Sequence, residues 1–395
     1  FDHLVIAAGA PKTCFLDDRH YPFRPNPHFK HWVPLTDHPY CWIAYTPGAR
    51  PVLAYYQPED FWHLPPATPS GAWVEQFDVR IIADPAEAAA HLPRNGRAAV
   101  IGEADAALDA ALPVPNNPEA VLNRLHWRRA TKTPWELSQM RQASRVAVAG
   151  HLAARAAFLD GASELGIHRA YLAATGHSDI SLPYGNIVGL NEHGAVLHYQ
   201  YQQAQAPAEH RSLLIDAGAE VAGYASDITR TFPVSGRFSR EQRALYDLVL
   251  AAQHAAMAEA RPGRPWIAGH EAAVATLTEG LLSLGLLRGS LERQLAEGGY
   301  RRFYMHKTGH WLGLDVHDVG DYRIDGEYRV LEPGMVFTIE PGLYVPPGSK
   351  GVPAKWHGIG IRIEDDVAIT AKGHEVLTAA LPNEAEAIEA LLADR

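Results

Sequence analysis

Short runs of apolar residues recur along the first third of the chain. Proline- and glycine-rich segments separate these runs, which cover residues 4–6, 42–45, 52–56, 79–82 and 98–101. Apolar runs of this length between such turn residues are typical of buried strands. We therefore expect a small α/β domain over residues 1–128.

Longer elements are expected beyond residue 129. The first long helix begins at a capping box, in which Thr133 caps, Pro134 takes the first helical position and Glu136 lies three residues after the cap. A second capping box pairs Ser239 with Gln242. The sequence thus predicts helices over residues 134–159, 239–260 and 266–284.

Strand-like segments lie between and after these predicted helices. They cover residues 213–216, 221–225, 335–340 and 359–364. Strands and long helices therefore alternate, and we expect an α+β domain over residues 129–395.

Composition fits a folded protein of this kind. The chain has 395 residues, of which 47% are hydrophobic and 20% are charged, as in ordinary globular proteins. The net charge is −10, which provides no basic surface for nucleic acid or an anionic membrane. No apolar run is long enough to span a bilayer. Only Cys14 and Cys41 occur, so we expect a reducing, cytoplasmic location.

Two carboxylates are placed to meet in the second half of the chain. Asp216 ends an aliphatic strand, and after a glycine-containing turn a second, paired strand is expected to bring Asp227 back eleven residues later. Two adjacent carboxylates repel each other unless a cation lies between them. This spacing favours a metal site, while the alternative is that both are turn or cap residues.

Three histidines lie close together in residues 306–318. His306 and His310 are four apart, as in helical zinc motifs, but Lys307 stands where such a motif has its glutamate. The segment is also rich in glycine, which lets the backbone approach a ligand closely. We therefore predict that His306, His310 and His317 lie on a loop or strand at a functional site, although a single histidine here would be structural.

Two further acids follow apolar strands. Glu340 precedes a Pro-Gly turn, and Glu364 shares one face of its predicted strand with Arg362. Asp216, Asp227 and these two acids, with one imidazole, suit two divalent ions such as manganese, cobalt or zinc. Two adjacent ions can activate a shared hydroxide and stabilise an oxyanion, so hydrolysis is the expected chemistry.

In order and spacing these residues resemble the pita-bread metallopeptidases, which include methionine aminopeptidase, aminopeptidase P and Xaa-Pro dipeptidase. The resemblance covers essentially the whole chain. It implies a pita-bread catalytic domain over residues 129–395, which follows the smaller N-terminal domain in the sequence. It also implies two divalent ions, with Mn²⁺ first and Co²⁺ or Zn²⁺ as alternatives. The implied metal ligands are Asp216, Asp227, His310, Glu340 and Glu364.

The same resemblance assigns active-site roles. It places the family's active-site histidines at His198, His306 and His317, and the arginine that supports the bridging glutamate at Arg362. Glu340 is expected to relay a proton from a hydroxide that bridges the two ions. His198 and His317 are expected to steady the oxyanion and the substrate.

Within the family, different segments of the chain resemble different groups of enzymes. Residues 15–34 and 182–188 resemble bacterial prolidase and organophosphorus acid anhydrolase, whereas residues 310–320 resemble aminopeptidase P. The resemblance implies hydrolysis of Xaa-Pro dipeptides. The alternatives are aminopeptidase P activity on longer Xaa-Pro peptides, or a pita-bread binding module without metal, and phosphotriester hydrolysis is a conceivable side activity. Lys307 departs from the family's usual glycine and bears on substrate reach.

The expected partners are small peptides and a second copy of the chain. Pita-bread peptidases are commonly dimeric or tetrameric, with an N-terminal segment near the neighbouring site. The aromatic loop at residues 61–66 is the candidate for that contact, and self-packing of the loop is the alternative. We expect a homodimer.

Overall fold

The computed structural model describes residues 1–105 and 111–393. Its chain divides into two units, Phe1–Arg128 and Arg129–Arg395. Among the described residues no helix is long and apolar enough to cross a membrane.

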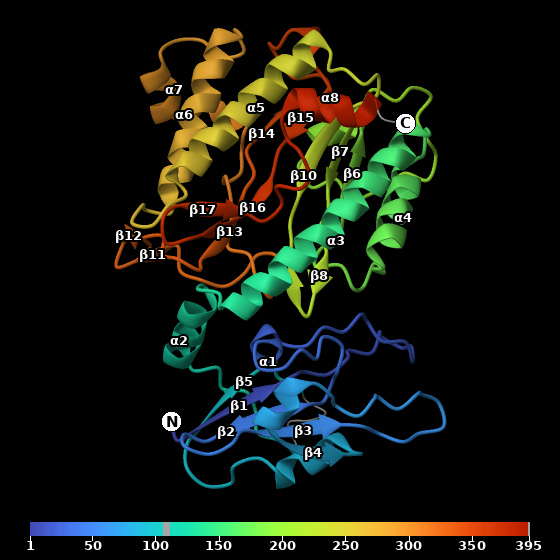
Figure 1. Cartoon of the computed structure of the whole chain (residues 1–395), viewed down its shortest axis with the longest axis vertical. Coiled ribbons are helices and arrows are strands. Elements are labelled where there is room, and N and C mark those ends of the chain that lie inside the picture. Colours follow the sequence, from blue (N-terminus) through green and yellow to red (C-terminus); the bar gives the residue numbers. More distant parts are fainter. Residues whose placement is uncertain (106–110, 394–395) are drawn as a thin grey trace. The chain divides into compact units, whose positions relative to one another are not determined.

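A five-stranded sheet organises the first unit (Figure 1). In the order β4-β3-β2-β1-β5, β1 pairs antiparallel with β2 and parallel with β5. Apolar clusters cover both faces of this sheet, which explains the continuous apolar runs. All five predicted strands are confirmed, at β1 (His3–Ala7), β2 (Trp42–Tyr45), β3 (Val52–Tyr56), β4 (Asp78–Ile82) and β5 (Ala98–Ile101). The helices that begin in this unit are α1 (Pro27–Lys30) and α2 (Glu119–Arg129).

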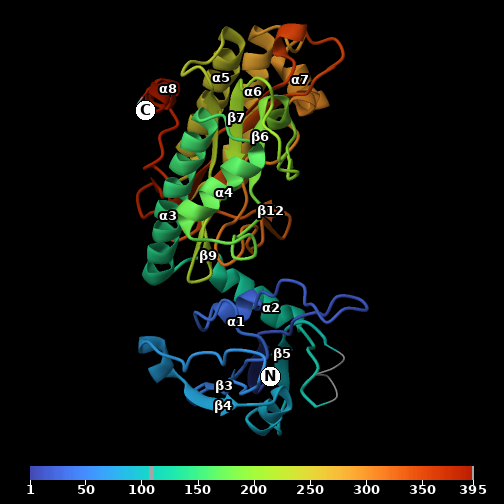
Figure 2. The same cartoon turned by 90° about the vertical axis from the view of Figure 1, so that its right-hand side faces the viewer.

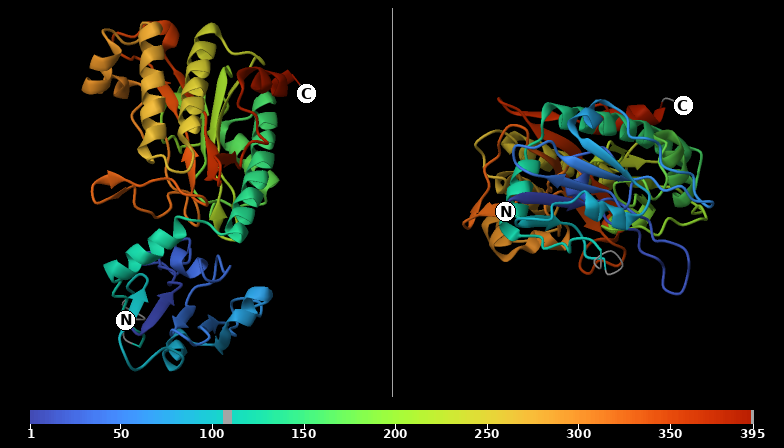
Figure 3. Two further views of the ribbon diagram at one scale, coloured as in Figure 1. Left: turned by 60° about the vertical axis from the view of Figure 1, so that its left-hand side comes forward. Right: turned by 90° about the horizontal axis from the view of Figure 1, so that it is seen from below.

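Long helices pair in the second unit. Both predicted capping boxes form, at Thr133 with Glu136 and at Ser239 with Gln242. Helix α3 lies beside α4, and α5 lies beside α6 (Figures 1 and 3). The helices are α3 (Pro134–Leu159), α4 (Glu164–Thr175), α5 (Arg240–Glu259), α6 (Ile267–Ser283), α7 (Leu291–Glu297) and α8 (Ala385–Ala393).

The second unit contains two antiparallel three-stranded sheets. One has the order β10-β7-β6, with α4 against β6 (Figure 2), and the other has the order β13-β16-β17. The strands are β6 (Ile187–Leu190), β7 (Ser212–Asp216), β10 (Thr229–Pro233), β13 (Val336–Ile339), β16 (Asp365–Ile369) and β17 (His374–Val376). Short pairs complete the unit, from β8 (Glu220–Val221), β9 (Tyr224–Ala225), β11 (Arg323–Ile324), β12 (Glu327–Tyr328), β14 (Gly342–Val345) and β15 (Ile359–Arg362).

Two predicted strands in this unit were wrong in extent. Residues 221–225 form two strands, β8 and β9, joined at Gly223, whose φ of 88° suits glycine alone. The predicted strand over residues 359–364 divides at Ile363 into β15 and β16, which pair with different partners. Glu364 lies at this change of partner and bridges to Thr229.

Candidate active site

The two predicted aspartates converge where β7 ends and β10 begins. Asp216 is the last residue of β7 and pairs with Thr229 of β10. The expectation that Asp227 lies on a strand was wrong, because β10 begins only at Thr229 and Asp227 enters from the adjoining loop. The Tyr184 hydroxyl contacts both carboxylates, lying 2.8 Å from Asp216 Oδ1 and against Asp227 Oδ1. This convergence favours the metal-site interpretation of the two aspartates over that of turn or cap residues.

His310 and the two glutamates reach the same point. The Nε2 atom of His310 lies 3.4 Å from Asp227 Oδ2 and 3.6 Å from Glu340 Oε1. Ligand atoms of Asp227, His310 and Glu364 all lie within 4.8 Å of one another. Asp216 joins the group through the Tyr184 hydroxyl, so the structure brings together the five predicted ligands.

A loop carries the histidines, as the sequence predicts. Residues 304–310 contain no helix, and the amide of His310 donates to Thr338 Oγ1 in β13 at 3.1 Å. A Cβ at Gly309 would lie 1.9 Å from the Thr338 carbonyl oxygen. The glycine therefore lets the loop lie against β13, and this backbone packing sets the position of His310.

Arg362 contacts one predicted ligand directly and a second one through Thr229. Its Nη2 donates to Asp216 Oδ2 at 2.7 Å and its Nε donates to Thr229 Oγ1 at 3.1 Å. The Thr229 hydroxyl in turn donates to Glu364 Oε2 at 2.6 Å. Arg362 thus holds Asp216 directly and reaches Glu364 through Thr229.

The other predicted histidines occupy different positions around this group. His306 Nε2 lies 3.0 Å from the Tyr344 hydroxyl, and His306 Nδ1 lies 3.6 Å from Glu340 Oε2. The His317 ring stands edge-on to the His310 ring, with centroids 4.4 Å apart. His198 is exposed and lines the cavity described next.

A cavity of about 880 Å³ opens above the carboxylates. The five predicted ligands and all three other histidines line it, together with Arg362 and Lys307. Aromatic side chains form another part of its lining, namely Trp266, Tyr322 and Tyr328. A cavity with apolar walls and a charged base suits a small peptide.

Burial and mutual repulsion dominate the electrostatics. Burial and the neighbouring Asp216 charge raise the pKa of Asp227, and burial with the Asp227 and Glu340 charges raises the pKa of Glu364 well above its ordinary value. Burial also raises the pKa of Glu340 to about 7. Ionising all these carboxylates together is unfavourable without added positive charge.

The pKa values of the histidines shift in opposite directions. Burial lowers the pKa of His310, but its hydrogen bond to Asp227 and the Glu340 charge outweigh burial and raise that pKa to about 9. Burial and the Arg362 charge lower the pKa of His306 to about 3, and burial and the His310 charge lower the pKa of His317. His306 and His317 are therefore neutral at pH 7.

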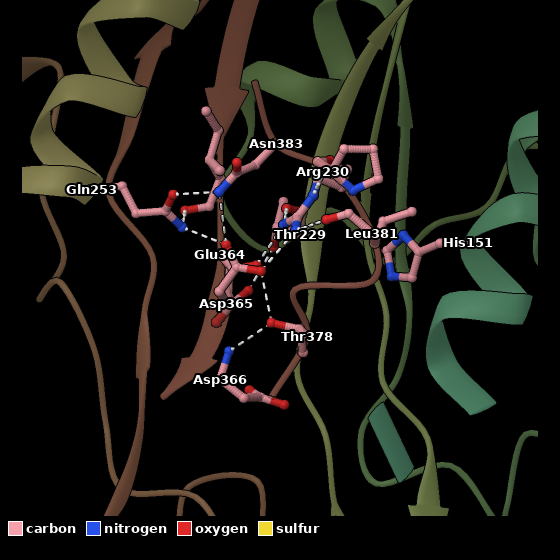
Figure 4. Close-up of polar contacts among 12 residues, drawn as sticks. His151, Thr229, Arg230, Gln253, Glu364, Asp365, Asp366, Thr378, Leu381 and Asn383 are labelled. Atoms are coloured by element: carbon pink, nitrogen blue, oxygen red, sulfur yellow. Dashed lines mark hydrogen bonds and ion pairs between the residues drawn. The ribbon is translucent and has the colours of Figure 1, made fainter. Parts of the chain in front are cut away.

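Beneath the site, a buried network holds the backbone of the ligand strands (Figure 4). Arg230 places its Nη1 2.9 Å from the Thr229 carbonyl and 2.7 Å from the Glu364 carbonyl, while its Nη2 binds Asp365 Oδ1 at 2.7 Å. Asp366 accepts from the Asp227 amide at 3.1 Å. Thr229, Glu364 and Asp227 are thus held from below by groups that face away from the cavity.

Tyr184, Thr229 and Tyr344 contact the site but were not predicted. Thr229 lies two residues after Asp227, and Tyr344 lies four residues after Glu340, but neither carboxylate lies inside a strand, so strand alternation does not single out Thr229 or Tyr344. Tyr184 has no local signal either, because its contact depends on the pairing of β6 with β7.

The donor set fits divalent ions. Four carboxylates and one imidazole offer mainly hard oxygen ligands, which manganese, cobalt and zinc accept. Among the described residues, the cations that pair with these carboxylates are Arg362 and His310. A divalent ion would replace the proton on His310 and offset the remaining charge.

Comparison with known proteins identifies the family. A sequence profile of metallopeptidase family M24 matches residues 138–371, more than half of the chain. The chain belongs to metallopeptidase family M24. In this M24 chain, a second profile, described as the N-terminal domain of Xaa-Pro dipeptidase, matches residues 1–127.

Relatives support the same placement of this M24 chain. It is 47% identical to an Xaa-Pro dipeptidase of Xanthomonas campestris pv. campestris (strain 8004), over 96% of the chain and 92% of the relative. It is 45% identical to an Xaa-Pro dipeptidase of Stenotrophomonas maltophilia (strain R551-3), over 96% and 91% respectively.

Solved structures resemble the fold of this M24 chain over nearly its full length. The aminopeptidase PepP of Pseudomonas aeruginosa matches with a TM-score of 0.86 and 35% identity, over 99% of this chain and 93% of that one. Zinc-substituted Escherichia coli aminopeptidase P, in complex with product, matches with a TM-score of 0.85 and 33% identity, over 99% and 94%. The predicted pita-bread fold is confirmed.

Proposed function

We propose that the chain hydrolyses Xaa-Pro dipeptides with the help of two divalent ions. The observation that carries this proposal is the set of four carboxylates and His310 at the base of an 880 Å³ cavity. The near full-length similarity to proteins named Xaa-Pro dipeptidase supports the substrate class.

Five residues would hold the ions: Asp216, Asp227, His310, Glu340 and Glu364. Manganese is the proposed ion, with cobalt and zinc as alternatives, because oxygen ligands dominate the set. When bound, a pair of divalent ions supplies an activated water nucleophile and stabilises negative charge on the scissile carbonyl.

The side chains around the cavity handle protons and orientation. Glu340, next to His306 and His310, accepts the proton of the attacking water and passes it to the departing proline nitrogen. His317 and His198 line the cavity and steady the developing oxyanion and the substrate. His306 and Arg362, joined through the Tyr344 hydroxyl, lie where they contact the substrate or hold the ligands.

Proline explains why a dedicated site is needed. Its tertiary amide has no N–H and its ring fixes φ, so a subsite that pairs with an extended backbone binds it poorly. The aromatic part of the lining, Trp266, Tyr322 and Tyr328, offers a surface without backbone hydrogen bonding.

Aminopeptidase P activity on longer peptides is the second candidate. The matches to aminopeptidase P structures favour it, as does the short separation of 24 positions between Glu340 and Glu364, which resembles that group. A binding module without metal is disfavoured because all five ligands and three further histidines line one cavity.

Substrate length separates the two activities. We would measure turnover of Ala-Pro, Ala-Pro-Ala and a longer Xaa-Pro peptide by protein stripped of metal, before and after adding manganese. Metal-dependent cleavage confined to Ala-Pro is the expected result. Preference for the longer peptides would assign the chain to aminopeptidase P, and failure to cleave any of them would contradict both.

We also infer a homodimer in the cytoplasm, from the family resemblance and the scarcity of cysteine. Phe61, Trp62 and Leu64 in the candidate contact loop are exposed. Light scattering on the purified protein tests the dimer, and a monomer at micromolar concentration would contradict it.

A further inference from the structure

We propose that Glu164 is a positioning residue that holds the cavity wall carrying His198. This inference rests on the proposed function. Glu164 begins α4, and its carboxylate accepts four hydrogen bonds from the His198 loop, which we define as residues 190–203. His198 lies inside this loop, and Leu197, His198 and Gln200 line the cavity.

The four donors are spread along the loop. Oε1 accepts from the Leu190 amide at 3.0 Å and from His193 Nδ1 at 2.7 Å. Oε2 accepts from the Tyr199 hydroxyl and the Gln203 amide, both at 2.8 Å. One carboxylate therefore ties both ends of the loop and two points between them, including the residue directly after His198.

Because Glu164 is buried, its carboxylate depends on these hydrogen bonds. Glu164 is only 1% exposed, and Tyr199 is 5% exposed. A buried carboxylate is tolerated only where hydrogen bonds replace its water. Its place in the first turn of α4, after the Ser163 cap, adds the favourable interaction of a negative charge with a helix N-terminus.

The loop is also attached through Asn191, whose Nδ2 donates to the Glu209 carbonyl at 2.8 Å and whose Oδ1 accepts from the Arg211 amide at 2.7 Å, and at the cavity edge. Gln200 Nε2 donates to the Gly185 carbonyl at 2.9 Å, next to Tyr184, which contacts Asp216 and Asp227. By contrast, His198 itself is exposed. The direction of the His198 side chain therefore depends on how the backbone on either side is held, and Glu164 accepts hydrogen bonds on both sides of His198.

Only a carboxylate accepts all four bonds. In Glu164→Gln, the amide nitrogen would face two hydrogen-bond donors. The two hydrogen bonds on that side of the group would be lost, and the loop would be held less firmly. A loop held less firmly misplaces His198, and a small misplacement of a group at a reacting centre costs up to about a hundredfold in rate.

A double-mutant cycle tests the proposal. On the manganese-loaded full chain, kcat/KM for Ala-Pro would be measured for Glu164→Gln, His198→Ala and the double variant. We expect Glu164→Gln to lower kcat/KM on the order of tenfold. We expect the double variant to match His198→Ala within about twofold, because residues that act as one unit are not additive.

The control is Glu375→Gln on β17, which loses a carboxylate paired with Arg141 at 2.7 Å. Glu375 does not line the cavity, so its effect should combine additively with His198→Ala. Additivity between Glu164→Gln and His198→Ala would overturn the proposal, because it would mean that Glu164 only stabilises the fold. Should Glu164→Gln fail to fold, Tyr199→Phe removes one of the four donors and enters the same cycle.

Hydrogen exchange gives a readout independent of activity. We expect amides in residues 190–203 to exchange faster in Glu164→Gln, while residues 212–216 of β7 keep their protection. Unchanged exchange in residues 190–203 would contradict the proposal that Glu164 holds this loop. If the wild-type chain does not hydrolyse Ala-Pro, the proposed function fails while the exchange experiment still decides whether Glu164 holds the loop.

Discussion

The base of the cavity and its walls are built in different ways. The base, formed by the five predicted ligands, rests on strand ends and on a loop packed against β13, with the Arg230 network beneath. The walls that carry His198 and His317 are loops without regular secondary structure at those residues. The base therefore obtains its geometry from the sheets, whereas each wall needs its own anchor.

Both walls use a buried carboxylate as that anchor. The His198 loop is tied to Glu164. The His317 loop, residues 311–320, is tied through Asp318, whose carboxylate pairs with Arg129 and lies 3.1 Å from Lys132 Nζ. Asp318 directly follows His317, and both charged partners are buried. Each wall is thus held by hydrogen bonds or ion pairs to one buried carboxylate, which makes the walls separable from the base by mutation.

The largest expected effect lies in the base. Glu340→Gln should lower kcat for Ala-Pro by about 10²–10⁴-fold, because a positioned proton acceptor contributes about that factor. Metal content, measured on the same sample, shows whether the loss comes from proton transfer or from a missing ion. Near-normal turnover with full metal content would remove Glu340 from the proposed proton path.

Asp318→Asn should affect mainly the stability of a wall. Removing one member of a buried ion pair leaves the other uncompensated and costs about 3–5 kcal/mol. Urea unfolding measures this loss, and Glu375→Gln, which removes a half-exposed pair, should lose under about 1 kcal/mol. Equal stability of the two variants would mean that charge does not hold the His317 loop.

In the metal-free protein, the groups at the base of the cavity should make the stability depend on pH. The folded chain raises the pKa of His310 from 6.5 to about 9 and that of Glu340 from 4.5 to about 7. Between pH 6.5 and 9 the native state therefore binds more protons than the unfolded state, so the free energy of unfolding falls as pH rises. Each unit of pKa difference is worth about 1.4 kcal/mol.

Urea unfolding of chelator-treated protein at several pH values checks this prediction. His310→Gln should flatten the dependence, and added manganese should do the same because it replaces the proton on the imidazole. A metal-free protein that grows more stable from pH 6.5 to 9 would contradict the proposed electrostatics of the base.

The smallest effect is expected at the rim. Lys307 is exposed and lines the cavity, so Lys307→Gly should raise the rate for Ala-Pro-Ala relative to Ala-Pro by making room for a longer peptide. The comparison is Lys372→Gly, at an exposed turn that does not line the cavity. The same ratio in both variants would show that Lys307 does not limit substrate length.

The same contrast explains what the sequence could predict. The helices from Thr133 and Ser239 follow local capping signals, and the candidate ligands fall at strand ends or in a short histidine-rich segment. Local patterns were sufficient for these features. The break at Ile363 was missed because β15 and β16 pair with different strands.

The supports of the walls could not be predicted in this way. Glu164 and Gln203 are 39 residues apart, and Arg129 and Asp318 are 189 apart. Neither pair has a periodicity or motif that links its members, because packing of separate elements brings them together. The roles of the site residues remain predictions, and they come from the family resemblance rather than from local patterns.

One titration tests the account most directly. Metal-free protein would be titrated with manganese while bound metal and Ala-Pro turnover are followed together, for the wild type and for Asp227→Asn. The account predicts wild-type activity that rises from zero to a plateau at two ions per chain, with loss of metal and activity in the variant. Full turnover without metal, or metal binding unchanged by Asp227→Asn, would contradict it.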